Sequence, residues 1–303
     1  MPRSSGQGPS RPNAGLRSRN EPSGGPWTNR KVLQRIVYAV TTKHHVQTII
    51  RDTGPYSARN VAKGASITDA AQVFACLREE LTVEQVRDRA RDGKVLSQRG
   101  RSSRDRIWAS LHHRYLTHRI PWIIDALVAA FGHGEQSSEF ISLLYLHYAL
   151  RDHLTFDFVT EVLWRKGYAN RPVVQRADLV DFLDQAAAEQ PQIARWTEQS
   201  RLKVANSILT ALRDFGVLEG TRNKVLVRPV LPLGTAEHLL RVLVTEGQRG
   251  RQALEDPAWR LFMLGPQDVA ATLAKLAQEG RIRFEKVGRT VVLETPQAWE
   301  QSP

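Results

Sequence analysis

A run of arginines near the middle of the chain has the chemistry to bind phosphate groups. Residues 87–119 contain ten Lys or Arg against three Asp, and the densest part reads Arg99-Gly-Arg-Ser-Ser-Arg-Asp-Arg106. Guanidinium groups bind phosphate through a planar fork of N–H donors. The run leads into a predicted helix at 107–116, which Ser102 or Ser103 could cap, so that the amides of its first turn would face the same anion. The predicted contacts here are Arg99, Arg101, Ser102, Arg104, Arg106 and Arg114. The alternative is a solvated charged loop, because most runs of charged residues are solvated and bind nothing.

A second set of polar residues follows a long predicted helix from Thr197 to Phe215 and the hairpin after it. Arg, Asn and Gln can read base edges, whereas Lys and Arg hold phosphates. The exposed candidates on the helix are Gln199, Arg201, Lys203, Asn206, Thr210 and Arg213. The candidates on the hairpin are Arg222, Asn223, Lys224 and Arg228.

No arrangement of residues in the sequence indicates catalysis. The single cysteine, Cys76, lies in an apolar run that predicts a buried, inert thiol, and one cysteine excludes a multi-cysteine zinc site in a monomer. His112, His113 and His118 do not share one helical face. There is no Walker-type glycine loop and no nucleophile elbow. We therefore expect a protein that is not an enzyme, with no metal, cofactor or small-molecule substrate.

The overall charge favours a polyanionic partner. Lys and Arg number 43 against 31 Asp and Glu, which gives a net charge of +12 and an isoelectric point near 10.2. The segment after Met1 has no apolar core of a secretory signal, and no apolar run approaches the length of a membrane span. These features predict a cytoplasmic protein without membrane contact.

The hydrophobic periodicity predicts a mainly α fold that begins with a helical bundle. Residues 1–28 read as a disordered basic tail, and residues 29–172 as the bundle. Within it, Ser66 opens a helix that runs to Leu81, and Thr82 with Gln85 has the form of a capping box. Three richly apolar helices follow at 122–131, 139–151 and 156–166.

The C-terminal half repeats one order of elements, which predicts two winged-helix-like modules at 173–230 and 231–296, followed by a tail at 297–303. Each has a helix, a long second helix that ends at Gly216 or Gly280, and a small β-hairpin. In the second module Thr235 is the predicted cap of the helix 236–246. The second helix of such a pair usually enters the major groove. That helix is poor in charge in the second module, which favours packing or protein interaction there.

Four stretches together resemble the BrxA family of the BREX bacteriophage-exclusion systems. They are 95–107 (VLSQRGRSSRDRI), 144–161 (LYLHYALRDHLTFDFVTE), 193–205 (IARWTEQSRLKVA) and 212–220 (LRDFGVLEG). The resemblance spans roughly residues 36–230. It implies a cytoplasmic, largely helical component of a phage-defence cluster that binds double-stranded DNA and has no known catalytic motif. It also implies a bundle similar to the antitermination factor NusB. The basic tail and the second winged-helix-like module depart from the shorter family members.

The charge, the two basic segments and the resemblance together predict a DNA-binding accessory subunit that works with other BREX proteins. The alternative is a protein-interaction adaptor that scaffolds other defence subunits through its winged-helix-like modules. RNA binding is a variant of the first reading, because the resemblance to NusB makes structured RNA a conceivable ligand.

Overall fold

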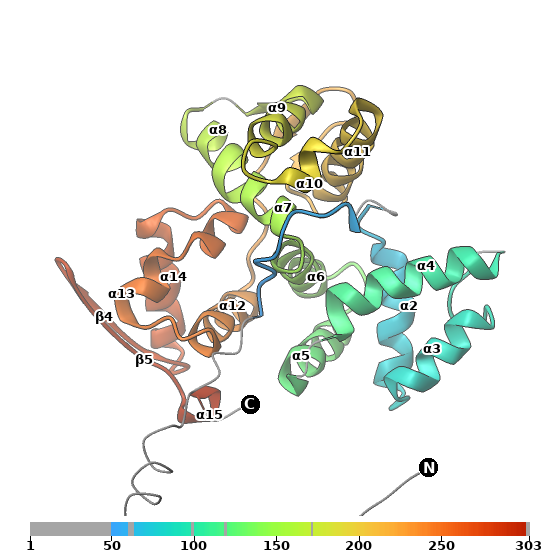
Figure 1. Ribbon diagram of the computed structural model, residues 1–303. Helices are drawn as coiled ribbons and strands as arrows, with labels where there is room; N and C mark the ends of the chain where they lie inside the picture. Colours follow the sequence, from blue (N-terminus) through green and yellow to red (C-terminus); the bar gives the residue numbers. More distant parts are fainter. Residues whose placement is uncertain (1–49, 60–63, 98–99, 118–119, 171, 301–303) are drawn as a thin grey trace, which may run out of the picture. The chain divides into compact units, whose positions relative to one another are not determined.

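The computed structural model describes residues 50–59, 64–97, 100–117, 120–170 and 172–300 (Figure 1). The chain divides into two compact units, Met1–Val46 and Gln47–Pro303. The first unit lies outside the described residues, and so does the predicted tail at 1–28. The described residues of the second unit are mainly helical, with small antiparallel sheets, which confirms the predicted mainly α class.

The first helices of this unit are α2 (Ile67–Arg78), α3 (Val83–Arg91) and α4 (Arg101–Leu111), which continues into a π-helical turn η2 (His112–Leu116). The predicted capping box is confirmed, because Thr82 and Gln85 cap each other's backbone at the start of α3. The expected loop and cap before residue 107 are wrong. Helix α4 begins at Arg101 with Gly100 at the N-cap, and Ser102 and Ser103 lie inside its first turn.

The centre of the hydrophobic core is α6 (Ser138–Leu150), of whose 13 residues ten are buried. It is flanked in sequence by α5 (Pro121–Phe131) and by α7 (His153–Asp157), which continues through the π-helical η3 (Phe158–Leu163) into α8 (Trp164–Tyr168). These elements match the three predicted apolar helices. Such burial explains why α6 is apolar almost all round rather than amphipathic.

The next segment comprises β1 (Val173–Val174), α9 (Arg176–Ala186), α10 (Pro191–Ala194), α11 (Glu198–Asp214), β2 (Leu218–Glu219) and β3 (Lys224–Leu226). The strands form an antiparallel sheet in the order β1-β3-β2. Helix α11 starts as predicted, because the Thr197 hydroxyl accepts a hydrogen bond from the Ser200 amide. It ends at Asp214, and Gly216, the predicted stop signal, follows two residues later with a φ of +74°. The strand β1 was not predicted, since two residues show no periodicity.

The last segment comprises α12 (Leu233–Thr245), α13 (Gly250–Glu255), the 3-10 helix η4 (Pro257–Phe262), α14 (Pro266–Gln278), β4 (Arg283–Val287), β5 (Thr290–Glu294) and α15 (Gln297–Glu300). Helix α14 and the β4–β5 hairpin lie where they were expected. Thr235 is not a cap, because α12 begins two residues before it. A short helix, α15, replaces part of the expected tail.

Polar side chains connect α6 to the last segment across the buried core. The hydroxyls of Ser142 and Thr235 are 2.7 Å apart, and the Nε2 atoms of His147 and His238 are 2.8 Å apart. The Tyr145 hydroxyl donates to the Leu261 carbonyl at 3.0 Å. Thr235 is therefore a buried packing residue. None of the helices in the described ranges is long and apolar enough to cross a bilayer.

Candidate nucleic-acid interface

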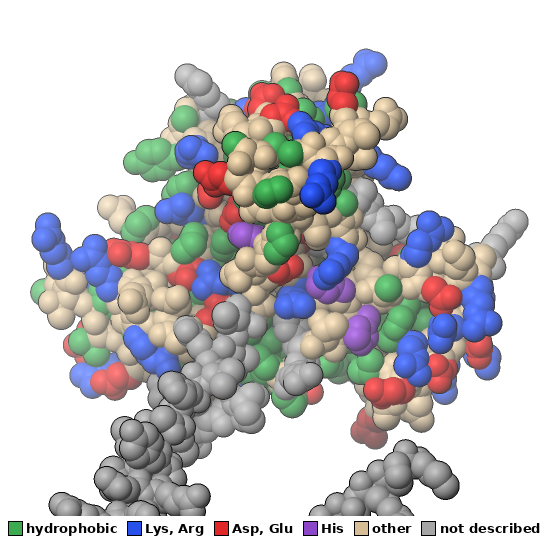
Figure 2. All heavy atoms as spheres, in the orientation of Figure 1, with side chains coloured by type: hydrophobic (Ala, Val, Ile, Leu, Met, Phe, Trp, Pro, Cys, Tyr) green, Lys and Arg blue, Asp and Glu red, His purple; other side chains and the backbone are tan. Residues whose placement is uncertain are grey.

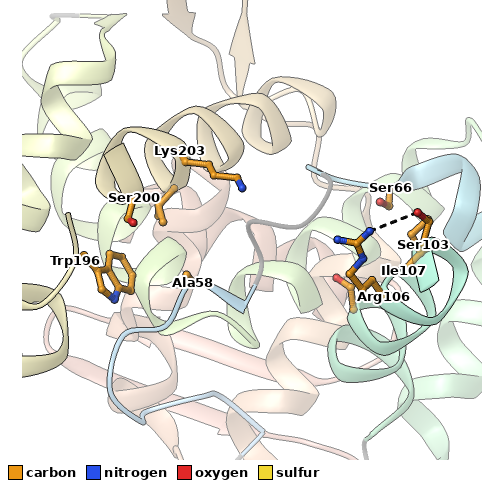
Figure 3. Close-up of a pocket in the computed structure, with 10 residues that line it drawn as sticks. Ala58, Ser66, Ser103, Arg106, Ile107, Trp196, Ser200 and Lys203 are labelled. Atoms are coloured by element: carbon orange, nitrogen blue, oxygen red, sulfur yellow. Dashed lines mark hydrogen bonds between the residues drawn. The ribbon is translucent and has the colours of Figure 1, made fainter. Parts of the chain in front are cut away.

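A cleft of about 500 Å³, the α4–α11 cleft, lies between these two helices and brings the two predicted basic segments together (Figure 3). Its lining residues are Ala58, Ser66, Ser103, Arg106, Ile107, Ser110, Trp196, Ser200, Lys203 and Val204. Figure 3 shows Lys203 on the α11 side and Arg106 on the α4 side of the cleft.

Helical spacing explains why these residues line one cleft. On α4 the lining residues are 103, 106, 107 and 110, which recur at intervals of three and four and so share one helical face. On α11 they are 200, 203 and 204, one turn after Trp196. Each helix turns at least one serine, one cation and one aliphatic residue toward the cleft.

The cleft carries two cations that no carboxylate neutralises within the described part of the chain. Among the described residues, the Arg106 guanidinium donates only within its own helix, to the Ser102 carbonyl at 3.3 Å and the Ser103 hydroxyl at 3.5 Å. Lys203 is exposed and forms no ion pair with any described residue. The Ser110 hydroxyl is buried and has no hydrogen-bond partner among these residues. The cleft thus offers positive charge and hydroxyl groups to an anionic ligand.

None of the other described residues that were predicted as contacts at the start of α4 lines the cleft. Arg99 lies outside the described residues. Arg101 and Ser102 are exposed at the start of the helix, outside the lining of the cleft. Arg104 donates to the Arg91 carbonyl at 2.9 Å and so joins α4 to the end of α3.

Arg114 is not a nucleic-acid contact, because its side chain is completely buried. Its Nη1 donates to the Ala65 carbonyl at 3.3 Å, and its guanidinium stacks on the Tyr148 ring at 4.7 Å from the centroid. The position follows Ile107 and Leu111 by seven and three residues, which places it on their buried helical face. Its charge was therefore a misleading signal.

The α11 candidates also divide into exposed and engaged residues. Gln199 and Asn206 are exposed. Arg201, predicted to be exposed, is instead held by an ion pair with Asp184 and a hydrogen bond to the Ile193 carbonyl, and only 20% of its side chain is exposed. Arg213 pairs with the neighbouring Asp214 at 2.8 Å.

On the hairpin side, Arg222 is exposed, and Lys224 donates to the Thr221 carbonyl at 3.0 Å. Arg228 pairs with Asp268 of α14 at 3.3 Å. Basic and acidic side chains are interspersed over the face shown in Figure 2. Among such mixed charges, the cations without a carboxylate partner are the ones available to phosphate. The predicted residues that meet this condition within the described ranges are Arg101, Arg106, Lys203, Arg222 and Lys224.

Sequence reasoning missed Trp196, Ser110 and Ser200 as lining residues. Spacing from Arg106 and Lys203 could have identified the two serines, which stand four residues after Arg106 and three before Lys203. Cys76, expected to be buried, is only partly so, and burial raises the pKa of its thiol.

Comparison with known proteins places the larger part of the chain in one family. The family model described as BrxA matches residues 54–242, well over half of the chain. The chain is also similar to the crystal structure of an uncharacterized protein from Magnetospirillum magneticum, with a TM-score of 0.55 and 17% sequence identity. That alignment covers 70% of this chain and 100% of the other, and it shows a shared fold. No curated protein matches the chain.

Proposed function

This chain belongs to the BrxA family, and from that membership and the α4–α11 cleft we propose that it is a non-catalytic, double-stranded DNA-binding component of a BREX-type phage-exclusion system. The observation that carries the proposal is that Arg106 and Lys203 line the same cleft from two different helices. Neither has a carboxylate partner among the described residues. Cations that are not already paired can replace the counterions of a DNA backbone without first breaking an ion pair.

The elements around α11 support the same proposal. We assign β1, α9 to α11 and the β2–β3 hairpin to a winged-helix module, in which the long helix before the hairpin is the usual DNA-contacting element. The exposed Gln199 and Asn206 are suited to base edges, and Arg222 and Lys224 on the hairpin to the backbone. The α12–α14 helices with the β4–β5 hairpin repeat this order, and we assign them to a second such module.

The test is a salt titration of duplex binding by fluorescence anisotropy. The double variant Arg106→Ala/Lys203→Ala should bind a labelled duplex more weakly and lower the log–log salt slope by about two, because roughly one counterion is released per phosphate contact. The matched control is Arg251→Ala/Arg281→Ala, which removes two cations held by Glu255 and by Glu237, each at 2.7 Å. Equal losses in the two double variants, or salt-independent binding, would contradict the proposed interface.

A protein-interaction adaptor is a second candidate, favoured by an apolar cleft elsewhere in the molecule. This cleft of about 740 Å³ lies beside α8, β3 and α14, and its lining includes Trp164, Leu226 and Met263. Tyr168, also in its lining, is 86% exposed. Contiguous apolar surface, unlike a single exposed side chain, marks an interaction site. Co-purification with the other BREX proteins after nuclease treatment, abolished by Tyr168→Ser, would support the adaptor, and retention by that variant would contradict it.

A further inference from the structure

We propose that the α4–α11 cleft holds a single DNA nucleotide that has left the base stack, with its phosphate at Arg106 and Lys203 and its base against the indole of Trp196. The inference rests on the proposed function and deepens it. It changes the expected ligand from a continuous duplex to a duplex with an unpaired nucleotide.

The lining of the cleft has two kinds of surface. Arg106 and Lys203 supply the positive charge. Ala58, Ile107, Trp196 and Val204 supply apolar surface that a phosphate alone would leave unused. A cavity of about 500 Å³ falls in the range of pockets that enclose whole small ligands. A phosphate joined to a flat ring uses both kinds of surface.

The bases of an intact duplex cannot reach this surface, because they are stacked and paired inside the helix. Proteins that bind a base in a pocket take it out of the stack, and this costs least where the base is already unpaired. The phosphates of a continuous duplex could therefore contact the two cations while the rest of the cleft stays empty. An unpaired nucleotide adds the base contact.

Trp196 is held in position for stacking. Its amide donates to the Ile193 carbonyl at 3.0 Å, and the next residue, Thr197, caps α11. The ring is partly exposed and lines the cleft, on the α11 side in Figure 3. Stacking of one base on an aromatic side chain corresponds to about a 5- to 150-fold change in affinity and tolerates any base.

Serine hydroxyl groups also line the cleft. Ser103 and Ser110 come from α4, and Ser200 comes from α11. A serine hydroxyl both donates and accepts, so it can bond to the edge of any base or to a sugar or phosphate oxygen.

The test compares two labelled duplexes of the same sequence, one continuous and one with a single bulged thymidine, by fluorescence anisotropy. The bulged duplex should bind at least about fivefold more tightly. Trp196→Ala should remove this difference, whereas Trp196→Phe should keep most of it. Trp164→Ala, which removes an indole outside the cleft, is the matched control, and circular dichroism checks that each variant is folded.

The outcomes separate this inference from the proposed function. Equal affinity for the two duplexes, or a preference that survives Trp196→Ala, overturns the nucleotide pocket, while the Arg106/Lys203 variant still tests duplex binding. Failure of both duplexes to bind contradicts the proposed function. A titration with thymidine monophosphate identifies the source of the nucleotide. The titration and the duplex comparison are read together. If thymidine monophosphate saturates the change in Trp196 fluorescence and the bulged duplex binds no more tightly than the continuous one, the cleft binds a free nucleotide and not a nucleotide within a DNA strand.

Discussion

His153, the first residue of α7, joins the segment before α2 to Asp157 through two polar contacts. Its Nδ1 donates to the Gly54 carbonyl at 2.6 Å, and its Nε2 lies 3.1 Å from an oxygen of Asp157. The same carboxylate oxygen accepts from the Tyr56 hydroxyl at 2.6 Å. The hydrogen bond to Asp157 raises the pKa of His153 to about 9, against the effect of burial. Burial and the Asp157 carboxylate also raise the pKa of Tyr56.

The raised pKa of His153 predicts a stabilisation that depends on pH. A group with a raised folded-state pKa stabilises fully below its unfolded pKa, near 6.5, and loses this contribution as the pH rises through the folded value of about 9. We expect Asp157→Asn to lower the free energy of unfolding by about 1–3 kcal/mol at pH 6, and by less at pH 10. Urea unfolding across this range measures both. A difference between wild type and variant that stays constant with pH would contradict the charged pair.

At the scale of elements, the end of α11 determines where the β2–β3 hairpin begins. The Gly216 and Val217 amides donate to the Arg213 and Leu212 carbonyls at 3.0 and 2.8 Å, which is the bonding pattern of a Schellman motif. The motif needs a residue in the left-handed region, and Gly216 has a φ of +74° there. The side chain that follows, Val217, is thereby buried in the core.

Two glycine substitutions test this termination signal. A Cβ at Gly216 or at Gly234 meets no atom within 4 Å, so only the backbone conformation distinguishes the two sites. Gly216→Ala should destabilise the protein by about 1–2 kcal/mol, because alanine disfavours the left-handed region. Gly234→Ala, inside α12, should stabilise it by up to about 1 kcal/mol, because alanine is the better helix former. Urea unfolding measures the stability of both variants. If the two substitutions changed the free energy of unfolding in the same direction, the backbone conformation at Gly216 would not be the cause of its effect.

Elements with a local signal could be predicted from the sequence. Helix α14 runs from Pro266 to Gln278 and so ends just before the predicted Gly280, since a proline at its start and a glycine after its end are chemical signals. Helix α13 and strand β1 are short and carry no such signal. Thr235 looked like a cap because its residue type suits one, but its hydroxyl bonds to Ser142, 93 residues away.

The cleft itself could be predicted only in part. Arg106 and Lys203 were identified from their charge and from the helices that carry them. Their position on one cleft depends on the packing of segments nearly a hundred residues apart, which a single sequence does not contain. The same limit explains the errors at Arg114 and Arg201, whose partners Ala65, Tyr148 and Asp184 are brought near by tertiary packing.

At the scale of the whole unit Gln47–Pro303, the segment 50–58 ties distant elements together. The Glu246 carboxylate, at the end of α12, accepts from the Ile50 and Arg51 amides at 2.9 and 2.8 Å. The Arg51 guanidinium donates to Glu246 at 2.6 Å and to both oxygens of Asp256 at 2.9 Å. The next amide, that of Asp52, donates to the Leu150 carbonyl at the end of α6 at 2.7 Å.

The two carboxylates around Arg51 are 5% exposed, so removing this cation takes a charged partner away from two buried negative charges. We expect Arg51→Ala to lower the free energy of unfolding by about 3 kcal/mol. Arg213→Ala, which breaks an ion pair with a carboxylate 33% exposed, should cost less than about 1 kcal/mol. Urea unfolding measures both, and hydrogen exchange should show faster opening of the Ile50 to Asp52 amides in the first variant. Protection of these amides at the wild-type level would mean that backbone contacts alone hold the segment, and that the forked ion pair contributes little to joining α6 and α12.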